Sequence, residues 1–305
     1  MRNSASAKWA FYMKRFCANV CKTARNSRAE RATFRRKPFG LRAKKNVIVR
    51  LEKNGSAFSV AAKVLIGADG ANSRVAKDLK LDENREWIVG YEEVYRSENS
   101  SREPRLHCFL DAELAPGYLA WLADDGEEIH IGVGGYAADF RPREALKSFK
   151  EKIGDLFDLK TEKLAETRGG RIPVGGVLWR IGSEYGLLIG DAAGAVSPLT
   201  AGGLDPAMRL SRYAAEIVRE RLRTDDPKVL LNYSGGHFRA RFVSRLWMRR
   251  LIRTFSNQNL LELGFAFLCS RVGRKFARHV FFGRGSFPDA KFEGKTAAEV
   301  VWQKN

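Results

Sequence analysis

The feature that most constrains the fold of this 305-residue chain is a buried strand that ends at a Gly-Asp pair and is followed by small residues. An apolar run at residues 187–189 predicts the strand, and Gly190 and Asp191 end it. A second small-residue turn at residues 200–203 opens a predicted helix that continues to about Leu222. A carboxylate therefore lies at the carboxyl end of a parallel strand and close to a helix N-terminus, where open α/β sheets bind ligands.

The chemistry of this pair indicates a particular kind of ligand. Bare amides and the positive dipole end of a helix suit a group that carries or develops negative charge. A carboxylate accepts hydrogen bonds from sugar-like hydroxyls. The pair therefore suggests a cofactor with a polyol chain and an electron-accepting ring. The alternative is an ordinary turn with an acidic cap, but such a turn does not need the crowding of Gly194, Pro198, Gly202 and Gly203.

The same pattern occurs earlier in the chain. Residues 64–76 read Val-Leu-Ile-Gly-Ala-Asp-Gly-Ala-Asn-Ser-Arg-Val-Ala, again a buried strand, a turn of glycine and acid, and the start of a helix. Asp69 and Gly70 stand at this turn. One such turn is weak evidence for a nucleotide cofactor, but two in one chain favour an α/β cofactor-binding domain.

At these residues the chain resembles a known family. Residues 66–75 resemble the Asp-Gly motif of FAD-dependent, hydroxylase-type flavoproteins, and residues 187–194 resemble their second motif, Gly-Asp. The segments at residues 169–176 and 197–203 are similar to those of the geranylgeranyl reductase family. The resemblance implies a mixed α/β fold: an incomplete Rossmann-like FAD-binding domain, an inserted antiparallel-sheet substrate domain and a C-terminal helical region.

The resemblance also implies the cofactor and its contacts. Asp191 would hold the ribityl chain of FAD, and the amides of residues 202–204 would face the pyrimidine side of the isoalloxazine ring. The electron donor is left open between NAD(P)H and ferredoxin. The cofactor-binding residues implied in this way are Asp69, Gly70, Gly190, Asp191, Ala192, Ala193, Gly194, Pro198, Gly202, Gly203 and Leu204.

Four segments follow from these motifs and from hydrophobic periodicity. Residues 46–84 and 180–225 form the FAD-binding domain, residues 85–179 the substrate domain and residues 226–305 the helical region, after an irregular basic segment at 1–45. A hairpin with a tight Asn54-Gly55 turn is expected at 46–62. The substrate domain is expected to hold strands at 87–95, 105–110, 118–122 and 128–134, and a helix at 142–153.

No Gly-x-Gly-x-x-Gly fingerprint precedes Asp69, although such flavoproteins bind the FAD pyrophosphate on that loop. Gly40 is the only glycine in the first 54 residues, and residues 1–50 hold 15 Lys and Arg against one acid, Glu30. Three explanations stay open: a frameshift or misplaced start, a shortened protein, or a basic arm for nucleic acid or membrane. A related alternative is an inactive fragment that binds no FAD.

The substrate domain carries a modified form of another family motif. Archaeal-type geranylgeranyl reductases have Tyr-x-Trp-x-Phe-Pro followed by Gly-x-Gly, and Tyr118 with Gly132 and Gly134 match that spacing. Ala120 stands where the family has tryptophan, and Trp121 comes one position late. In a strand, Trp121 would therefore point to the opposite face. These four residues, Tyr118, Trp121, Gly132 and Gly134, are the candidate substrate contacts, with plain core packing as the alternative.

The resemblance implies reduction of C=C bonds in an isoprenoid or related apolar substrate, with hydride supplied by the flavin and Tyr118 as candidate proton donor. The competing function is a flavin-dependent monooxygenase or halogenase on the same scaffold. Anaerobic alkene reduction would support the reductase, and oxygen-dependent consumption of NADPH with a hydroxylated product would support the monooxygenase.

The net charge of +19 is concentrated in two segments, so it does not favour a uniformly basic nucleic-acid-binding domain. The second segment, residues 239–284, has 11 Lys and Arg against one acid and alternates them with bulky apolar residues. Two interpretations stay open: amphipathic helices on an anionic membrane, or helices packed on the substrate domain. Four cysteines without metal-ligand spacing predict no metal site and a reducing cytoplasm, with or without peripheral membrane contact.

Overall fold

The computed structural model describes residues 46–53, 56–96, 105–136, 138, 140–154, 163–239, 242–254 and 258–282. The chain divides into two compact units, of which Ile48–Ala62 belong to the first and the described residues from Lys63 onward to the second. The predicted basic segment at 1–45 and residues 283–305 lie outside the described residues.

The first unit contains the predicted hairpin strands. β1 (Val47–Lys53) pairs with β2 (Ser56–Ala62) in a two-stranded sheet. Nearly all of β2 is exposed, including the apolar side chains of Phe58 and Val60. The Asn54-Gly55 turn that would join the strands lies outside the described residues.

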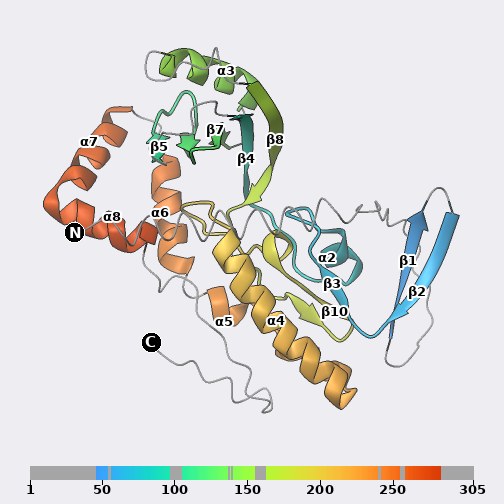
Figure 1. The fold of residues 1–305 in the computed structure, drawn as a ribbon. Helices are drawn as coiled ribbons and strands as arrows, with labels where there is room; N and C mark the ends of the chain where they lie inside the picture. Colours follow the sequence, from blue (N-terminus) through green and yellow to red (C-terminus); the bar gives the residue numbers. More distant parts are fainter. Residues whose placement is uncertain are drawn as a thin grey trace. The chain divides into compact units, whose positions relative to one another are not determined.

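The second unit contains the small sheet that carries both cofactor motifs (Figure 1). β10 (Gly186–Leu188) lies between β3 (Leu65–Gly67) and β9 (Gly182–Ser183). It runs parallel to β3, with Leu187 opposite Ile66, and antiparallel to β9. The two motifs therefore leave the sheet at the same edge, as expected for parallel strands.

Helices pack against this sheet in one core. They are α2 (Arg74–Asp78), the 3₁₀ turn η1 (Gly190–Ala193), α4 (Leu204–Thr224), the 3₁₀ turn η2 (Pro227–Asn232) and α5 (Gly236–Arg239). The predicted helix after Gly203 is confirmed and ends two residues beyond Leu222. Tyr233 anchors the arrangement, because its ring stacks on Tyr213 of α4 at 5.6 Å and its hydroxyl donates to the Leu188 carbonyl at 2.9 Å.

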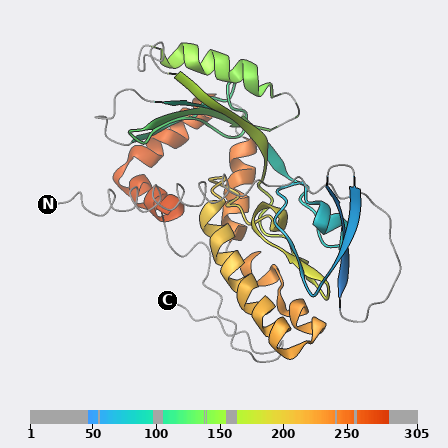
Figure 2. The same ribbon diagram turned by 45° about the vertical axis from the view of Figure 1, so that its right-hand side comes forward.

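The antiparallel sheet predicted for the substrate domain is present (Figures 1 and 2). Its strand order is β5-β6-β7-β4-β8, and all its pairings are antiparallel. α3 (Pro142–Ile153) covers one face, where Leu146 and Phe149 pack on Ile129 and Ile131. The strands are β4 (Trp87–Arg96), β5 (Arg105–Phe109), β6 (Ala120–Asp124), β7 (Glu128–Gly135) and β8 (Lys163–Pro173).

Two details of this sheet differ from the sequence prediction. β6 begins at Ala120 and not at Tyr118, because the Tyr118 amide donates to the Ala115 carbonyl at 3.0 Å and so belongs to the preceding turn. β8 was not predicted as a strand. It is an edge strand whose side chains are almost all exposed, so the sequence lacks the apolar alternation that marks a half-buried strand.

The chain after Tyr233 is helical as far as it is described. α6 (Val243–Thr254), α7 (Gln258–Cys269) and α8 (Arg271–Phe282) follow α5. The mixed α/β class with a helical C-terminal region is thereby confirmed. Among the helices that the structure describes, none is long and apolar enough to cross a bilayer.

Candidate functional site

The Gly-Asp turn requires glycine at its end. Gly194 adopts a φ of +68°, and a Cβ atom placed on it would lie 2.5 Å from the Gly176 carbonyl oxygen and 2.9 Å from Asn84 Oδ1. The Ala195 amide closes the turn by donating to the Gly190 carbonyl at 3.0 Å. The backbone of residues 190–195 is therefore held tightly between two other segments of the chain.

The Asp191 carboxylate faces the start of α4. A Cβ atom placed on Gly203, the N-cap residue of α4, would lie only 3.4 Å from Asp191 Oδ1. No side chain caps this helix, and no described residue donates a hydrogen bond to the Asp191 carboxylate. Burial raises the pKa of this carboxyl group. The structure thus brings a carboxylate that no described residue hydrogen-bonds next to an open N-terminus of a 21-residue helix, the juxtaposition that the sequence predicts.

The carboxylate of the first motif, that of Asp69, accepts hydrogen bonds from the residues around the start of α2. Asp69 Oδ1 accepts a hydrogen bond from Ser73 Oγ at 2.6 Å, and Oδ2 accepts from the Arg74 and Val75 amides at 2.6 and 3.1 Å. Gly70 makes the turn possible with a φ of +81°. Asp69 therefore holds the N-terminus of α2, and its predicted place beside a cofactor stays a prediction.

Asn84 connects the two motifs and was not singled out from the sequence. Its Nδ2 donates to the Ala71 carbonyl at 3.0 Å and to the Asp191 carbonyl at 2.8 Å. No periodicity marks this residue, which lies in an irregular polar segment before β4. A small pocket opens where the motifs meet, lined by Ala71, Asn72, Ser73, Ala76, Glu83, Asn84 and Ala192.

Replacing Asn84 with alanine is expected to lower the free energy of unfolding by about 1–3 kcal/mol, because two partly buried carbonyls lose their donor. Urea denaturation measures this change. Asn72→Ala is the matched control, since the Asn72 side chain takes part only in an exposed hydrogen bond with Lys77. Equal stabilities of the two variants would contradict the bridging role of Asn84.

The four candidate substrate residues lie together on the face of the large sheet away from α3, called here the second face. Ala120 is buried in the core shared with α3, so by alternation Trp121 lies on the second face. A Cβ atom on Gly132 would clash with the Trp121 ring, and one on Gly134 would lie 2.6 Å from Tyr118 Cδ1 and 3.6 Å from Trp121 Cζ3. Both glycines therefore make room for the two rings.

The prediction that Trp121 points away from position 120 is correct in direction. The rings of Trp121 and Tyr118 nevertheless lie on the same face. Tyr118 precedes the strand, and its ring lies over Gly134 next to the Trp121 ring. An aromatic surface thus exists on the second face without the family's tryptophan spacing.

Tyr118 connects the second face to the segment before α4. Its hydroxyl donates to the Thr200 carbonyl at 2.8 Å, and the Arg249 guanidinium lies 5.4 Å from its ring centroid. Burial raises the pKa of Tyr118 to about 12. The hydroxyl is therefore protonated at neutral pH with its proton directed at Thr200, and its role as proton donor to a substrate stays a prediction.

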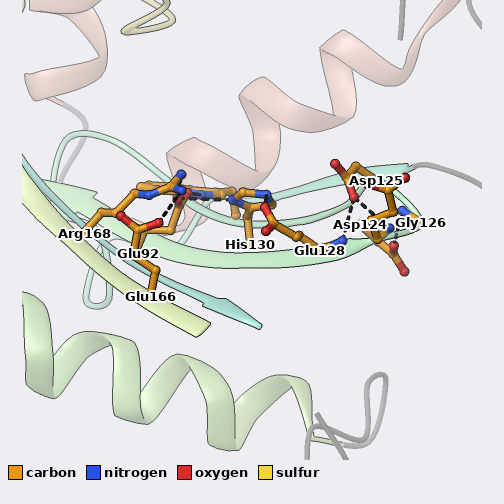
Figure 3. Close-up of polar contacts among 10 residues, drawn as sticks. Glu92, Asp124, Asp125, Gly126, Glu128, His130, Glu166 and Arg168 are labelled. Atoms are coloured by element: carbon orange, nitrogen blue, oxygen red, sulfur yellow. Dashed lines mark hydrogen bonds and ion pairs between the residues drawn. The ribbon is translucent and has the colours of Figure 1, made fainter. Parts of the chain in front are cut away.

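A polar network continues along the second face (Figure 3). Trp121, Gly132, Glu92 and Arg168 lie in register across β6, β7, β4 and β8. Glu92 Oε2 accepts from Trp121 Nε1 at 2.8 Å, and Glu92 Oε1 lies 3.3 Å from His130 Nδ1 and 3.7 Å from Arg168 Nη1. Burial opposes ionisation of Glu92, but hydrogen bonds from His130 and Trp121 outweigh it and lower its pKa.

The hydrogen bond with Glu92 raises the pKa of His130 above its usual 6.5. Protonation of His130 therefore stabilises the fold fully at pH values below 6.5, and this contribution is lost as the pH rises through the raised pKa. We expect NMR titration of His130 to show a midpoint above 6.5 that falls in Glu92→Gln. Glu166→Gln, which removes a carboxylate paired with Arg168, is the control. An unchanged midpoint in Glu92→Gln would contradict this pairing.

The sequence matches the FAD binding domain family over residues 42–249. It is 30% identical over 218 residues to digeranylgeranylglycerophospholipid reductase 2 of Methanopyrus kandleri, covering 68% of this chain and 52% of the relative. It is 31% identical to digeranylgeranylglycerophospholipid reductase of Methanocaldococcus jannaschii, covering 77% of this chain and 62% of the relative. The chain thus spans about half of the length of the curated relatives it matches.

The fold is similar to solved flavoprotein structures. A geranylgeranyl bacteriochlorophyll reductase-like protein from Thermoplasma acidophilum aligns with a TM-score of 0.62 at 19% identity, covering 76% of this chain and 62% of that protein. The flavin-dependent halogenase CmlS aligns with a TM-score of 0.53 at 15% identity, covering 87% of this chain and 52% of the halogenase. A reductase-like protein and a halogenase therefore share this architecture.

Proposed function

Because the chain belongs to the FAD binding domain family, in its geranylgeranyl reductase-like branch, we propose that it is an FAD-dependent reductase of C=C bonds in an isoprenoid or related apolar substrate. The observation that carries the proposal is the Asp191 carboxylate, without a hydrogen-bond donor among the described residues, beside the uncapped N-terminus of α4. Tyr118 connects this position directly to the second face of the large sheet.

The residues present fit a flavin with a polyol side chain. The Asp191 carboxylate is available to accept hydrogen bonds from ribityl hydroxyls, and the first amides of α4 are available to a ring that gains negative charge. Gly203 carries no side chain that would fill the space next to Asp191 Oδ1. When bound, FAD would supply the hydride for the reduction, with NAD(P)H or ferredoxin as electron source.

The protein would orient the substrate and keep water away from its double bond. The rings of Tyr118 and Trp121 lie side by side on the second face and offer an apolar surface for an alkene. The Trp121 indole is fixed by its hydrogen bond to Glu92, and the Tyr118 ring by its hydrogen bond to Thr200. Both rings are thus held before a substrate arrives, which lowers the entropy cost of orienting it.

Oxygen-dependent hydroxylation or halogenation is the second candidate, favoured by the likeness of the fold to CmlS. The segments at residues 169–176 and 197–203 favour the reductase, because they are similar to the reductase branch. The test is anaerobic incubation with FAD, dithionite and a geranylgeranyl lipid, followed by mass spectrometry. A gain of two hydrogens per double bond supports the reductase, whereas a product formed only with oxygen supports the second candidate.

We also propose that α6–α8 contact an anionic membrane surface. Large apolar side chains are exposed along these helices next to the exposed bases Arg250, Arg271, Arg274 and Lys275. This combination of exposed apolar and basic side chains is typical of helices that lie in the membrane interface. The exposed apolar residues are Val243, Trp247, Leu251, Leu263, Phe267, Val272 and Phe276.

Flotation with vesicles tests this contact. The protein is expected to float with vesicles that contain phosphatidylglycerol and to float less with pure phosphatidylcholine, because the basic side chains attract anionic lipid. Trp247→Glu combined with Leu251→Glu should abolish flotation. Leu164→Glu, which charges an exposed apolar side chain on β8, should not. Flotation that is independent of all three substitutions would contradict the proposal.

A further inference from the structure

α6 places one arginine in a buried position between two tyrosine rings. Arg249 is only 3% exposed, and its guanidinium carbon lies 5.4 Å from the ring centroid of Tyr118 and 5.0 Å from that of Tyr136. Its Nε donates to the Tyr136 hydroxyl at 2.9 Å. The adjacent Arg250 is exposed and lies over Trp247, so the two neighbouring arginines point to different sides of the helix.

No described residue neutralises the charge of Arg249. In the described part of the chain no carboxylate lies within ion-pair distance of Arg249, and its Nη2 is buried without a hydrogen-bond partner. The link to an acid is indirect, because the Tyr136 hydroxyl that accepts from Arg249 also donates to Glu86 Oε1 at 3.4 Å. A buried guanidinium with an unused donor carries a large desolvation penalty that an anion would offset.

The position of Arg249 matches the candidate substrate site. Tyr118, on whose ring the guanidinium lies, bonds to Thr200 in the segment before α4 and packs over Gly134 on the second face. Arg245, one turn earlier on α6, is half-buried, and burial lowers its pKa. The i, i+4 spacing places Arg245 on the same side of α6 as Arg249, and Arg249 is the arginine that contacts the Tyr118 ring.

We propose that Arg249 binds an anionic oxygen of the substrate, either a phosphate or a carboxylate group attached to the apolar chain. This inference rests on the proposed function, because it places the apolar part of the same ligand on Tyr118 and Trp121. The guanidinium carbon lies within cation–π distance of both rings, and the buried Nη2 keeps an unused donor that can hydrogen-bond to an oxyanion. Arg249 would thus select anionic ligands over neutral ones of the same chain length.

Binding measurements with matched ligands test the proposal. Calorimetry on the purified chain compares geranylgeranyl phosphate with geranylgeraniol, and inorganic phosphate alone serves as the third ligand. We expect the wild type to bind the phosphate ester about 10–100-fold more tightly than the alcohol, the range for a charge-assisted hydrogen bond. Arg249→Gln should remove this preference while changing the affinity for the alcohol by less than about twofold. Arg249→Lys should keep part of the preference. Arg141→Gln, which changes an exposed arginine paired with Glu144 at the start of α3, should keep all of it.

Three results would overturn the proposal. The first is that Arg249→Gln loses affinity equally for the phosphate ester and the alcohol. The second is that this variant still prefers the ester over the alcohol as strongly as the wild type does. The third is that inorganic phosphate binds to the wild type as tightly as the ester does. Decyl phosphate and decanol repeat the comparison with a saturated chain. The preference for phosphate can therefore be measured even if the natural substrate is not an isoprenoid. Flavin retention, measured separately by absorbance, shows whether the cofactor proposal fails on its own. If Arg249→Gln loses flavin but keeps the preference, the guanidinium serves the cofactor and not the substrate.

Discussion

Replacing Asp191 with alanine will weaken FAD binding by roughly 100-fold while leaving the fold intact. The half-buried carboxylate has no hydrogen-bond donor among the described residues, so its removal breaks no bond of the protein itself. It is placed to accept hydrogen bonds from ribityl hydroxyls, and bonds to a charged acceptor contribute about 1.5–3 kcal/mol each. Titration of the purified variant with FAD, followed by quenching of flavin fluorescence, measures the loss.

Asp205→Ala is the matched control for this experiment. Asp205 is an acid in the first turn of the same helix, but it is exposed and pairs with Arg209 at 2.9 Å. Its removal should change FAD affinity by less than about threefold, because an exposed ion pair contributes little. Equal losses of FAD affinity in both variants would mean that negative charge near the helix N-terminus, and not the position of Asp191, determines the affinity. Unchanged affinity in Asp191→Ala would reject Asp191 as the ribityl contact.

The second large effect is expected for Gly194→Ala. The positive φ costs any side chain about 1–2 kcal/mol, and the added methyl group would meet the Gly176 carbonyl oxygen at 2.5 Å. Because that oxygen belongs to backbone, the two segments must move apart, and we expect a loss of about 3 kcal/mol or more in the free energy of unfolding. Urea denaturation measures it.

Alanine substitutions at two other glycines distinguish the cost of backbone strain from the cost of the steric clash. Gly70 has a φ of +81° but nothing within 4 Å of its added methyl group, so Gly70→Ala should show the strain alone, about 1–2 kcal/mol. Gly170 on β8 has neither positive φ nor a neighbour within 4 Å, so Gly170→Ala should be close to neutral. If Gly194→Ala is no worse than Gly70→Ala, the contact between the Gly-Asp turn and Gly176 is weaker than the structure indicates.

Local sequence patterns predicted the elements that define the cofactor site. α4 follows its glycine-rich turn as expected, and α3 has the predicted bounds because an amphipathic pattern begins at a proline. β3 and β10 are only three residues long, yet their apolar residues and terminal glycines marked both. The juxtaposition of Asp191 and Gly203 followed from the rule that ligands bind at the carboxyl ends of parallel strands.

The residues that sequence reasoning missed act through tertiary contacts. Asn84 lies in an irregular segment, and its importance comes from two carbonyls that belong to different motifs. His130 is one of four scattered histidines, and only strand register brings it beside Glu92. Arg249 was part of a basic segment in the sequence, and only the packing of α6 separates it from the exposed Arg250. Patterns within one segment carry no information about such pairings.

The absorbance spectrum of the purified chain tests most directly whether the two motifs and α4 form a flavin site. The protein is incubated with FAD and desalted before the spectrum is recorded. We predict retained flavin bands near ~370 and ~450 nm in the wild type, with most of this absorbance lost in Asp191→Ala. A folded wild-type protein that leaves the column colourless would contradict a flavin site at these motifs.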